Sequence, residues 1–180
     1  RLHPNANPSR HGIEVVRDLP YREGGAVEPL LDVWRPKATT QPMPIVFYVH
    51  GGGFRFLSKD THWVMALSFA RAGYLVFNVS YRLAPRHPFP AAVEDIDDAW
   101  QWMLAHAAEY GGDTSRVAVA GESAGANLAM GLTLSTCYRR AEPHARAVFD
   151  AGVVPRACLP MCGMLQVSDP ARFARRKKLP

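Results

Sequence analysis

Short apolar runs alternate with helical patterns along the middle of the chain. Residues 45–49, 74–79 and 117–120 are almost entirely β-branched, aromatic or small apolar residues, which is typical of strands buried on both faces. Between these runs, apolar residues recur at helical spacing over 60–72 and 90–110. Because strands that alternate with helices build βαβ units, the chain predicts an α/β fold: a mostly parallel sheet with helices on both faces.

Further elements are expected on either side of this region. Residues 13–21 and 30–34 are predicted as two strands at an antiparallel edge, and the polar, proline-rich residues 1–12 as an irregular N-terminal segment. A third helix is predicted over 124–140. A fourth strand is predicted over 156–165, although Pro160 is unfavourable inside a sheet.

The sequence Gly-Glu-Ser-Ala-Gly at 121–125 lies where an apolar run ends and a helical pattern begins. A serine on so tight a turn takes a strained backbone conformation, and glycines two residues away on each side let the strand and the helix approach closely. Ser123 is therefore a candidate nucleophile, and the Ala124 N–H a candidate oxyanion donor. A glycine-rich turn without chemistry can have the same letters, so the motif alone leaves both interpretations open.

A second motif, His-Gly-Gly-Gly-Phe at 50–54, directly follows another apolar run. Consecutive glycines let backbone N–H groups point at a developing anion without interference from side chains. A phosphate-binding P-loop would need Gly-Lys followed by Ser or Thr, and Phe54-Arg55 stands there instead. The two motifs together, each at the end of an apolar run, predict an active site in which His50 is structural and holds the loop by hydrogen bonds.

Four segments together resemble the hormone-sensitive-lipase branch of the α/β-hydrolases, which includes many bacterial esterases. They are HGGGF at 50–54, YRLAP at 81–85 with FPAA at 89–92 and Asp95, YGGD at 110–113 through Arg116, and GESAG at 121–125 with NLA at 127–129. The resemblance covers residues 13–167 and implies the α/β-hydrolase fold. It also implies that Tyr81, Arg82 and Asp95 are structural.

The resemblance implies a serine-dependent carboxylic ester hydrolase that needs neither a metal nor a cofactor. Ser123 would be the nucleophile, and the backbones of Gly52, Gly53 and Ala124 would form the oxyanion hole. The substrates would be short- to medium-chain acyl esters, cleaved through an acyl-enzyme intermediate. Phe54, Phe56 and Phe89 are either walls of the substrate pocket or simply packing residues.

The sequence departs from the family in three places. Glu122 stands where Asp is common and Arg86 where an acidic residue is common, and both changes are tolerable. More seriously, the family's catalytic Asp and His come from later strands. His144 lies in a predicted surface connection and is not expected to be the base, so we expect the triad Asp and His outside this chain. Residues 1–180 would then be one partial domain: an incomplete part of the fold with its matching core at 13–167, and 168–180 the start of a cap segment or a cleaved or disordered end.

Composition limits the classes of partner. No apolar run reaches the roughly 18 residues of a membrane span, and no signal peptide is visible, which favours the cytoplasm. The net charge of +5 includes the basic run at 175–178, but no nucleic-acid motif accompanies it. The three cysteines are an odd number without metal-ligand partners, so we expect buried free thiols.

The expected partner is a small-molecule ester. A homodimer of the full-length protein and the remaining C-terminal part of its own sequence are further candidate partners. Because the chain lacks a convincing triad histidine, one alternative stays open: a non-catalytic protein that binds a small ligand on an α/β-hydrolase scaffold.

Overall fold

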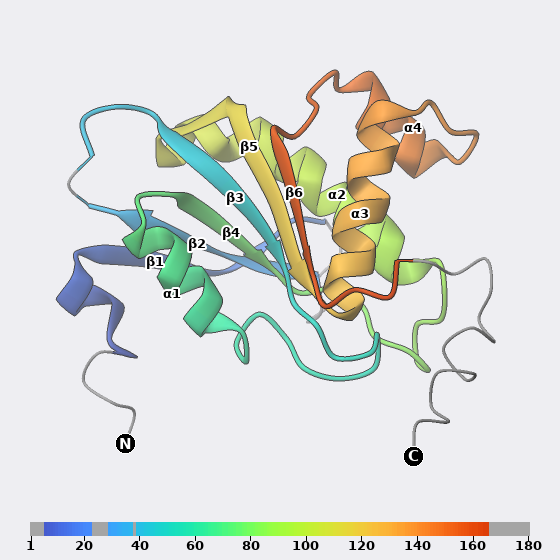
Figure 1. The fold of residues 1–180 in the computed structure, drawn as a ribbon, viewed down its shortest axis with the longest axis horizontal. Helices are drawn as coiled ribbons and strands as arrows, with labels where there is room; N and C mark the ends of the chain where they lie inside the picture. Colours follow the sequence, from blue (N-terminus) through green and yellow to red (C-terminus); the bar gives the residue numbers. More distant parts are fainter. Residues whose placement is uncertain (1–5, 23–28, 38, 166–180) are drawn as a thin grey trace, which may run out of the picture.

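The computed structural model describes residues 6–22, 29–37 and 39–165. In these residues, one six-stranded mixed sheet has the strand order β1-β2-β4-β3-β5-β6 (Figure 1). Its strands are β1 (Ile13–Pro20), β2 (Leu30–Pro36), β3 (Met43–Val49), β4 (Leu75–Val79), β5 (Gly112–Glu122) and β6 (Ala157–Met161). The strand β2 is antiparallel to β1 and β4, and the other pairs are parallel. The predicted mostly parallel sheet, with its antiparallel edge, is therefore confirmed.

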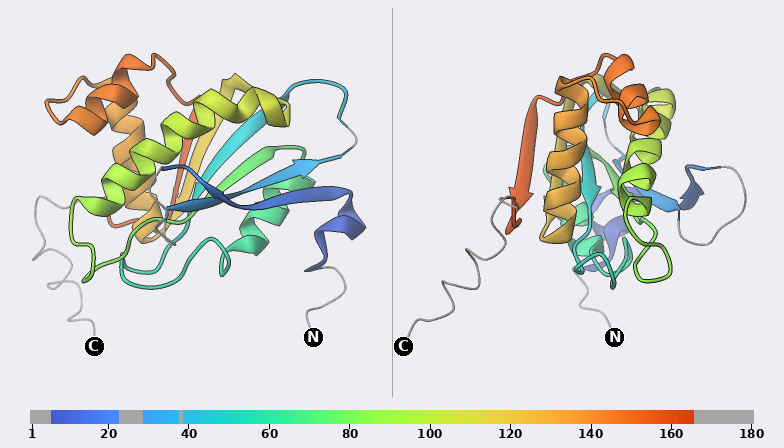
Figure 2. Two further views of the ribbon diagram at one scale, coloured as in Figure 1. Left: turned by 180° about the vertical axis from the view of Figure 1, so that it is seen from behind. Right: turned by 90° about the vertical axis from the view of Figure 1, so that its right-hand side faces the viewer.

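Helices cover both faces of the sheet, as expected. They are α1 (Trp63–Arg71), α2 (Ala91–His106), α3 (Ala124–Cys137) and α4 (Pro143–Asp150), with short 3₁₀ turns at η2 (Pro8–His11) and η3 (Ala107–Tyr110). The helix α1 packs on one face, and α2, α3 and α4 pack on the other (Figures 1 and 2).

The alternation of side chains along the strands divides the core into two layers. Phe47 of β3 points toward α2, where it meets Trp100 edge to face with ring centroids 5.6 Å apart. Its neighbours Val46 and Tyr48 point the other way and pack against Ala66 and Leu67 of α1. Both layers are buried around β3 and β4, so the end of β3, which precedes the glycine loop, is packed on both faces of the sheet.

Two elements differ from the sequence prediction. The strand β5 begins at Gly112 and not at residue 117, because its polar start pairs with β3 at Met43 and Pro44. Residues 143–150 form the helix α4 and not a surface connection. The only apolar side chains that α4 buries are Ala145 and Val148, too few to produce a visible helical pattern.

The end of the described chain also corrects two expectations. The predicted fourth strand is limited to Ala157–Met161. It is only partly buried, with Leu159 42% exposed, because β6 is the outermost strand described on its side of the sheet. The expectation of buried thiols is wrong: Cys137 and Cys162 are exposed, and Cys158 is half-buried. The predictions for 168–180, including the basic run at 175–178, lie outside the described residues, as do residues 1–5 of the N-terminal segment.

Candidate active site

Ser123 occupies the turn between β5 and α3. Its backbone has φ 52° and ψ −112°, a left-handed conformation that a serine adopts only under strain. Its N–H donates a hydrogen bond to the carbonyl oxygen of Met161 at 2.8 Å, and its own carbonyl oxygen accepts the N–H of Ala126 at 3.1 Å. The turn is thus fixed from both sides, while Ser123 itself is exposed.

The two flanking glycines have no room for a side chain. A Cβ on Gly121 would lie 2.3 Å from the carbonyl oxygen of Gly125, and a Cβ on Gly125 would lie 2.2 Å from the carbonyl oxygen of Val49. Both contacts are with backbone atoms, which cannot move aside as a flexible side chain would. The packing of β5 and α3 against the end of β3 therefore requires glycine at both positions.

The glycine loop at 51–53 lies directly beside the serine turn. A Cβ on Gly51 would lie 3.5 Å from the Cβ of Ser123 and 2.9 Å from the carbonyl oxygen of Glu122. Gly52 has φ +114°, and its carbonyl oxygen accepts the N–H of Phe56 at 3.0 Å. Gly53 also has a positive φ, +61°. The predicted oxyanion residues Gly52 and Gly53 thus belong to a tight loop that touches the nucleophile turn.

Ala124 is buried in the first turn of α3. The first backbone N–H groups of a helix have no partner within the helix, and the helix dipole is positive at this end. The third predicted oxyanion donor therefore sits where a helix favours negative charge.

The side chain of His50 is wholly buried beneath the loop, in agreement with the predicted structural role. Burial lowers the pKa of His50 to about 4, so the ring is neutral at pH 7. Its Nδ1 lies 2.6 Å from the carbonyl oxygen of Gly51 and, in a neutral ring, carries the proton that it donates there. The ring stacks on that of Tyr81 at 4.3 Å, and the Tyr81 hydroxyl donates to the carbonyl oxygen of His50 at 3.0 Å.

Arg82 and Asp95 hold the segment that follows β4 against α2. The buried carboxylate of Asp95 accepts hydrogen bonds from the Arg82 backbone N–H at 2.7 Å and from its Nε at 2.8 Å. This agrees with the structural role expected for these residues. Arg22, which the sequence reasoning missed, also pairs with Asp95 at 3.1 Å.

Lys59 and His62, also missed, lie in the segment that joins the glycine loop to α1. The Lys59 ammonium is buried among Asp18, Asp32 and Asp60, at 2.7, 2.9 and 3.0 Å. Burial alone would lower the pKa of Lys59, but its hydrogen bonds to these carboxylates outweigh burial and raise the pKa. His62 approaches Glu122, the residue before the nucleophile, with 3.6 Å between Nε2 and Oε2. No spacing pattern signals these contacts, because the partners come from distant segments.

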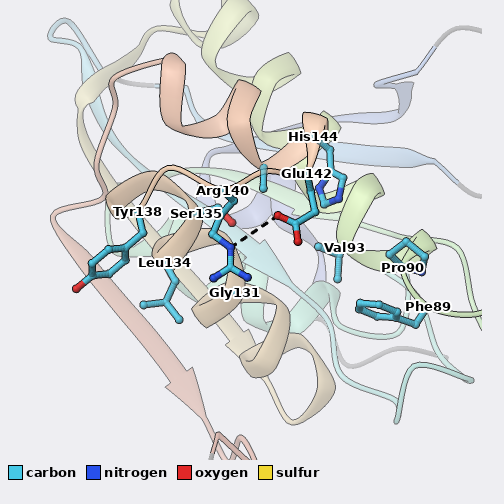
Figure 3. A pocket seen from close by; sticks show the side chains of 11 residues that line it. Phe89, Pro90, Val93, Gly131, Leu134, Ser135, Tyr138, Arg140, Glu142 and His144 are labelled. Carbon is cyan, nitrogen blue, oxygen red and sulfur yellow. Dashed lines mark ion pairs between the residues drawn. The ribbon is translucent and has the colours of Figure 1, made fainter.

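His144, on α4, has an ionic partner on α2. Its Nδ1 lies 2.6 Å from the buried carboxylate of Asp97 on α2. Burial raises the pKa of Asp97, although the contact with His144 lowers it in part. His144 lines a cavity with Gly131 (Figure 3), eight residues beyond Ser123 and so about 12 Å along the helix. His144 is therefore not placed to act on Ser123. This agrees with the sequence analysis, which did not expect His144 to be the base.

A mostly apolar cavity of about 380 Å³ opens beside the glycine loop. Gly53, Phe54, Phe89 and Leu128 are among the residues that line it. Phe54 and Phe89 are thus walls of this cavity, whereas Phe56 does not line it and is 66% exposed. A pocket with apolar walls beside the glycine loop suits the hydrocarbon part of a small ligand.

Two kinds of site have no support within residues 6–22, 29–37 and 39–165. No group of three or more histidine, cysteine or acidic side chains is arranged to hold a metal ion. No helix in the same ranges has the length and apolar character that crossing a membrane requires.

Comparison with known proteins identifies relatives of this chain. The carboxylesterase NlhH of Mycobacterium tuberculosis is 42% identical over 118 residues, which are 65% of this chain and 34% of NlhH. The structure of the esterase LipW of Mycobacterium marinum is 40% identical, with a TM-score of 0.64, and the match covers 71% of this chain and 40% of LipW. A bacterial heroin esterase is 34% identical, with a TM-score of 0.62, over 80% of this chain and 42% of that enzyme.

The chain spans about a third of the length of the curated relatives that it matches. Residues 46–179 match the family described as alpha/beta hydrolase fold, and this range includes both glycine motifs. The chain therefore belongs to the α/β-hydrolases, in the hormone-sensitive-lipase-like branch that contains bacterial carboxylesterases.

Proposed function

We propose that the protein is a serine carboxylesterase that cleaves short- to medium-chain acyl esters. The observation that carries this proposal is the contact between Ser123 and the glycine loop. A serine in a left-handed turn lies next to Gly51, at the junction of two motifs 70 residues apart in the sequence. Backbone strain concentrates where function requires it, and here it exposes one hydroxyl.

In the proposed reaction, the Ser123 Oγ attacks the carbonyl carbon of the ester and forms a tetrahedral intermediate. The backbone N–H groups of Gly52, Gly53 and Ala124 stabilise its negative oxygen. A histidine takes the serine proton and passes it to the leaving alkoxide, which produces an acyl-enzyme and an alcohol. Water then attacks the acyl-enzyme while the histidine takes its proton. The histidine returns that proton to the serine oxygen as the carboxylic acid leaves.

We assign the histidine and its acidic partner to residues outside this chain. His50 is unsuited to the base's role, because its Nδ1 is engaged with Gly51 and its ring is buried. His144 is committed to Asp97. The short span of the chain relative to NlhH supports this assignment.

The test is the Ser123→Ala variant of the full-length protein, assayed with p-nitrophenyl butyrate. We expect kcat to fall by about a thousandfold or more, because a triad without its nucleophile keeps only the contribution of the oxyanion hole. Ser68→Ala is the matched control, since Ser68 is an exposed serine in the interior of α1 that lines none of the cavities near the serine turn, and it should keep near wild-type turnover.

A fluorophosphonate probe gives a second readout, because it should label Ser123 in the wild-type protein and not in Ser123→Ala. Unchanged turnover in Ser123→Ala would refute the proposal. Absence of both labelling and turnover in the wild type would instead favour the ligand-binding alternative.

A further inference from the structure

Three neighbouring cavities share lining residues and are together called the groove: the first lies between the glycine loop and the start of α2, and the other two lie between α2 and α3. The first, of about 380 Å³, begins at Gly53. The second, of about 170 Å³, shares Phe54 and Phe89 with the first. The third, of about 520 Å³, shares Val93 and Gly131 with the second (Figure 3). The groove therefore starts at the proposed oxyanion loop and continues along α3, away from Ser123.

The walls of this groove are mainly hydrocarbon. In Figure 3, Phe89 and Val93 lie on one side, and Leu134 and Tyr138 lie on the other. Phe89, Leu134 and Tyr138 are 88%, 49% and 65% exposed. Contiguous exposed apolar surface of this kind is unusual unless it binds something. Its continuity with the site at Gly53 points to an apolar extension of the molecule bound there.

Polar groups bound the far end of the groove. The ion pair of Arg140 and Glu142, with 3.8 Å between Nε and Oε2, lies there beside His144 (Figure 3). A hydrocarbon chain gains nothing by displacing water from charged groups, so the apolar part of the groove ends before them.

Gly131 lies at the passage between the second and third cavities. It is an exposed position in the interior of α3, and a Cβ built there meets no heavy atom within 4 Å. No packing or backbone geometry therefore requires glycine at this position, in contrast to Gly121 and Gly125 on either side of the nucleophile. Any larger side chain at 131 would project into the open passage.

We propose that the groove holds the acyl chain of the ester, and that the missing side chain at Gly131 sets the longest chain that fits. This inference rests on the proposed ester hydrolysis at Ser123 and extends it to the choice of substrate. Short acyl groups occupy only the cavity beside Gly53, whereas longer chains pass between Phe89 and Leu128 and continue beyond Gly131.

The test is the Gly131→Leu variant of the full-length protein, assayed with p-nitrophenyl acetate and p-nitrophenyl decanoate. We expect kcat/KM for the decanoate to fall by about tenfold or more and that for the acetate to stay within about twofold, because blocking a hydrophobic pocket costs binding of each excluded methylene. Gly131→Ala, with its small side chain, should resemble the wild type. Ala105→Leu adds the same side chain at an exposed position of α2 that lines none of the three cavities, and it should leave the chain-length profile unchanged.

Binding of the fluorescent fatty acid cis-parinaric acid tests the groove separately from catalysis. The Ser123→Ala variant should bind this probe, and the double variant with Gly131→Leu should bind it several-fold more weakly. Equal losses on acetate and decanoate, an unchanged profile, or unaltered probe binding would each overturn the inference. If the wild type hydrolyses no ester, the proposed function fails, while the probe still shows whether the groove takes an acyl chain.

Discussion

Gly125 packs its backbone directly against the end of β3, where the carbonyl oxygen of Val49 would lie 2.2 Å from any Cβ. The carbonyl oxygen of His50 would lie only 2.4 Å from the same atom. This contact joins the nucleophile turn to β3, the strand that leads into the glycine loop. The distance between the nucleophile turn and the glycine loop therefore depends on the absence of a side chain at Gly125.

Gly125→Ala should therefore destabilise the protein strongly. Backbone must move to relieve the clash, and we expect the free energy of unfolding to fall by about 3 kcal/mol or more. Gly131→Ala is the control on the same helix: with open space around its Cβ, it should raise stability by about 0.5–1 kcal/mol through better helix propensity. Urea denaturation measures both. Similar midpoints for the two variants would contradict the packing described here.

Gly52→Ala should impair catalysis more than Gly53→Ala. A Cβ on Gly52 would lie 1.9 Å from the carbonyl oxygen of Phe56, so the loop must shift. Its N–H groups would then no longer point at the oxyanion. We expect kcat for p-nitrophenyl butyrate to fall by about a hundredfold, the effect of losing one oxyanion donor. At Gly53 nothing lies within 4 Å, and only the left-handed φ opposes alanine, at about 1–2 kcal/mol. Equal kcat values would argue against a fixed loop.

Lys59→Met should destabilise the fold by about 3 kcal/mol, because it leaves the carboxylate of Asp32 buried without its ammonium partner. Arg17 contacts the same carboxylate at 3.2 Å but is half exposed, so it compensates only in part. Lys37→Met removes an exposed lysine and should change stability by less than about 0.5 kcal/mol. Thermal or urea unfolding at pH 7 gives the free energy of unfolding of each variant. Equal free energies for the two variants would show that the buried ion-pair network does not stabilise the fold.

The stability of the protein should decrease in mild acid through His50. Its pKa is about 4 in the folded chain, below the ordinary 6.5. Between these values the unfolded state binds a proton that the folded state does not, so the contribution of neutral His50 is complete above pH 6.5 and is lost as the pH falls toward 4. The loss amounts to at most about 3 kcal/mol.

Urea denaturation between pH 4 and 8 measures this effect when the wild type is compared with His50→Gln, which cannot titrate. Subtracting the two curves isolates His50 from the carboxylates that titrate in the same range. A difference between the curves that does not change with pH would show that His50 is not buried in its neutral form.

Local patterns were sufficient to predict the strands and helices that place the serine. Continuous apolar runs lead to β3, β4 and the buried part of β5 because a strand covered on both faces needs apolar side chains on both. The glycine motifs predict the turns at 51–53 and 121–125, because only glycine tolerates such close approach of the backbones. The α/β fold class and the positions of the serine turn and the glycine loop follow from adjacent residues.

The helix α4 and the start of β5 escaped prediction because their stability comes from partners elsewhere in the chain. Gly112 and Asp113 become a strand by pairing with Met43 and Pro44, and α4 is helical because Ala145 and Val148 pack into the helix layer. Partial burial of β6 follows from its place in the strand order, which no stretch of sequence displays.

By itself, the sequence predicted an α/β fold with a serine turn and a glycine loop, because these features depend on neighbouring residues, and its resemblance to a known family implied the α/β-hydrolase fold. Only the tertiary structure decided which distant groups meet: Lys59 with Asp32, His144 with Asp97, and Gly53 with the groove that passes Gly131. Contacts of this kind depend on how distant segments pack together in the fold, and a linear sequence pattern does not contain that geometry.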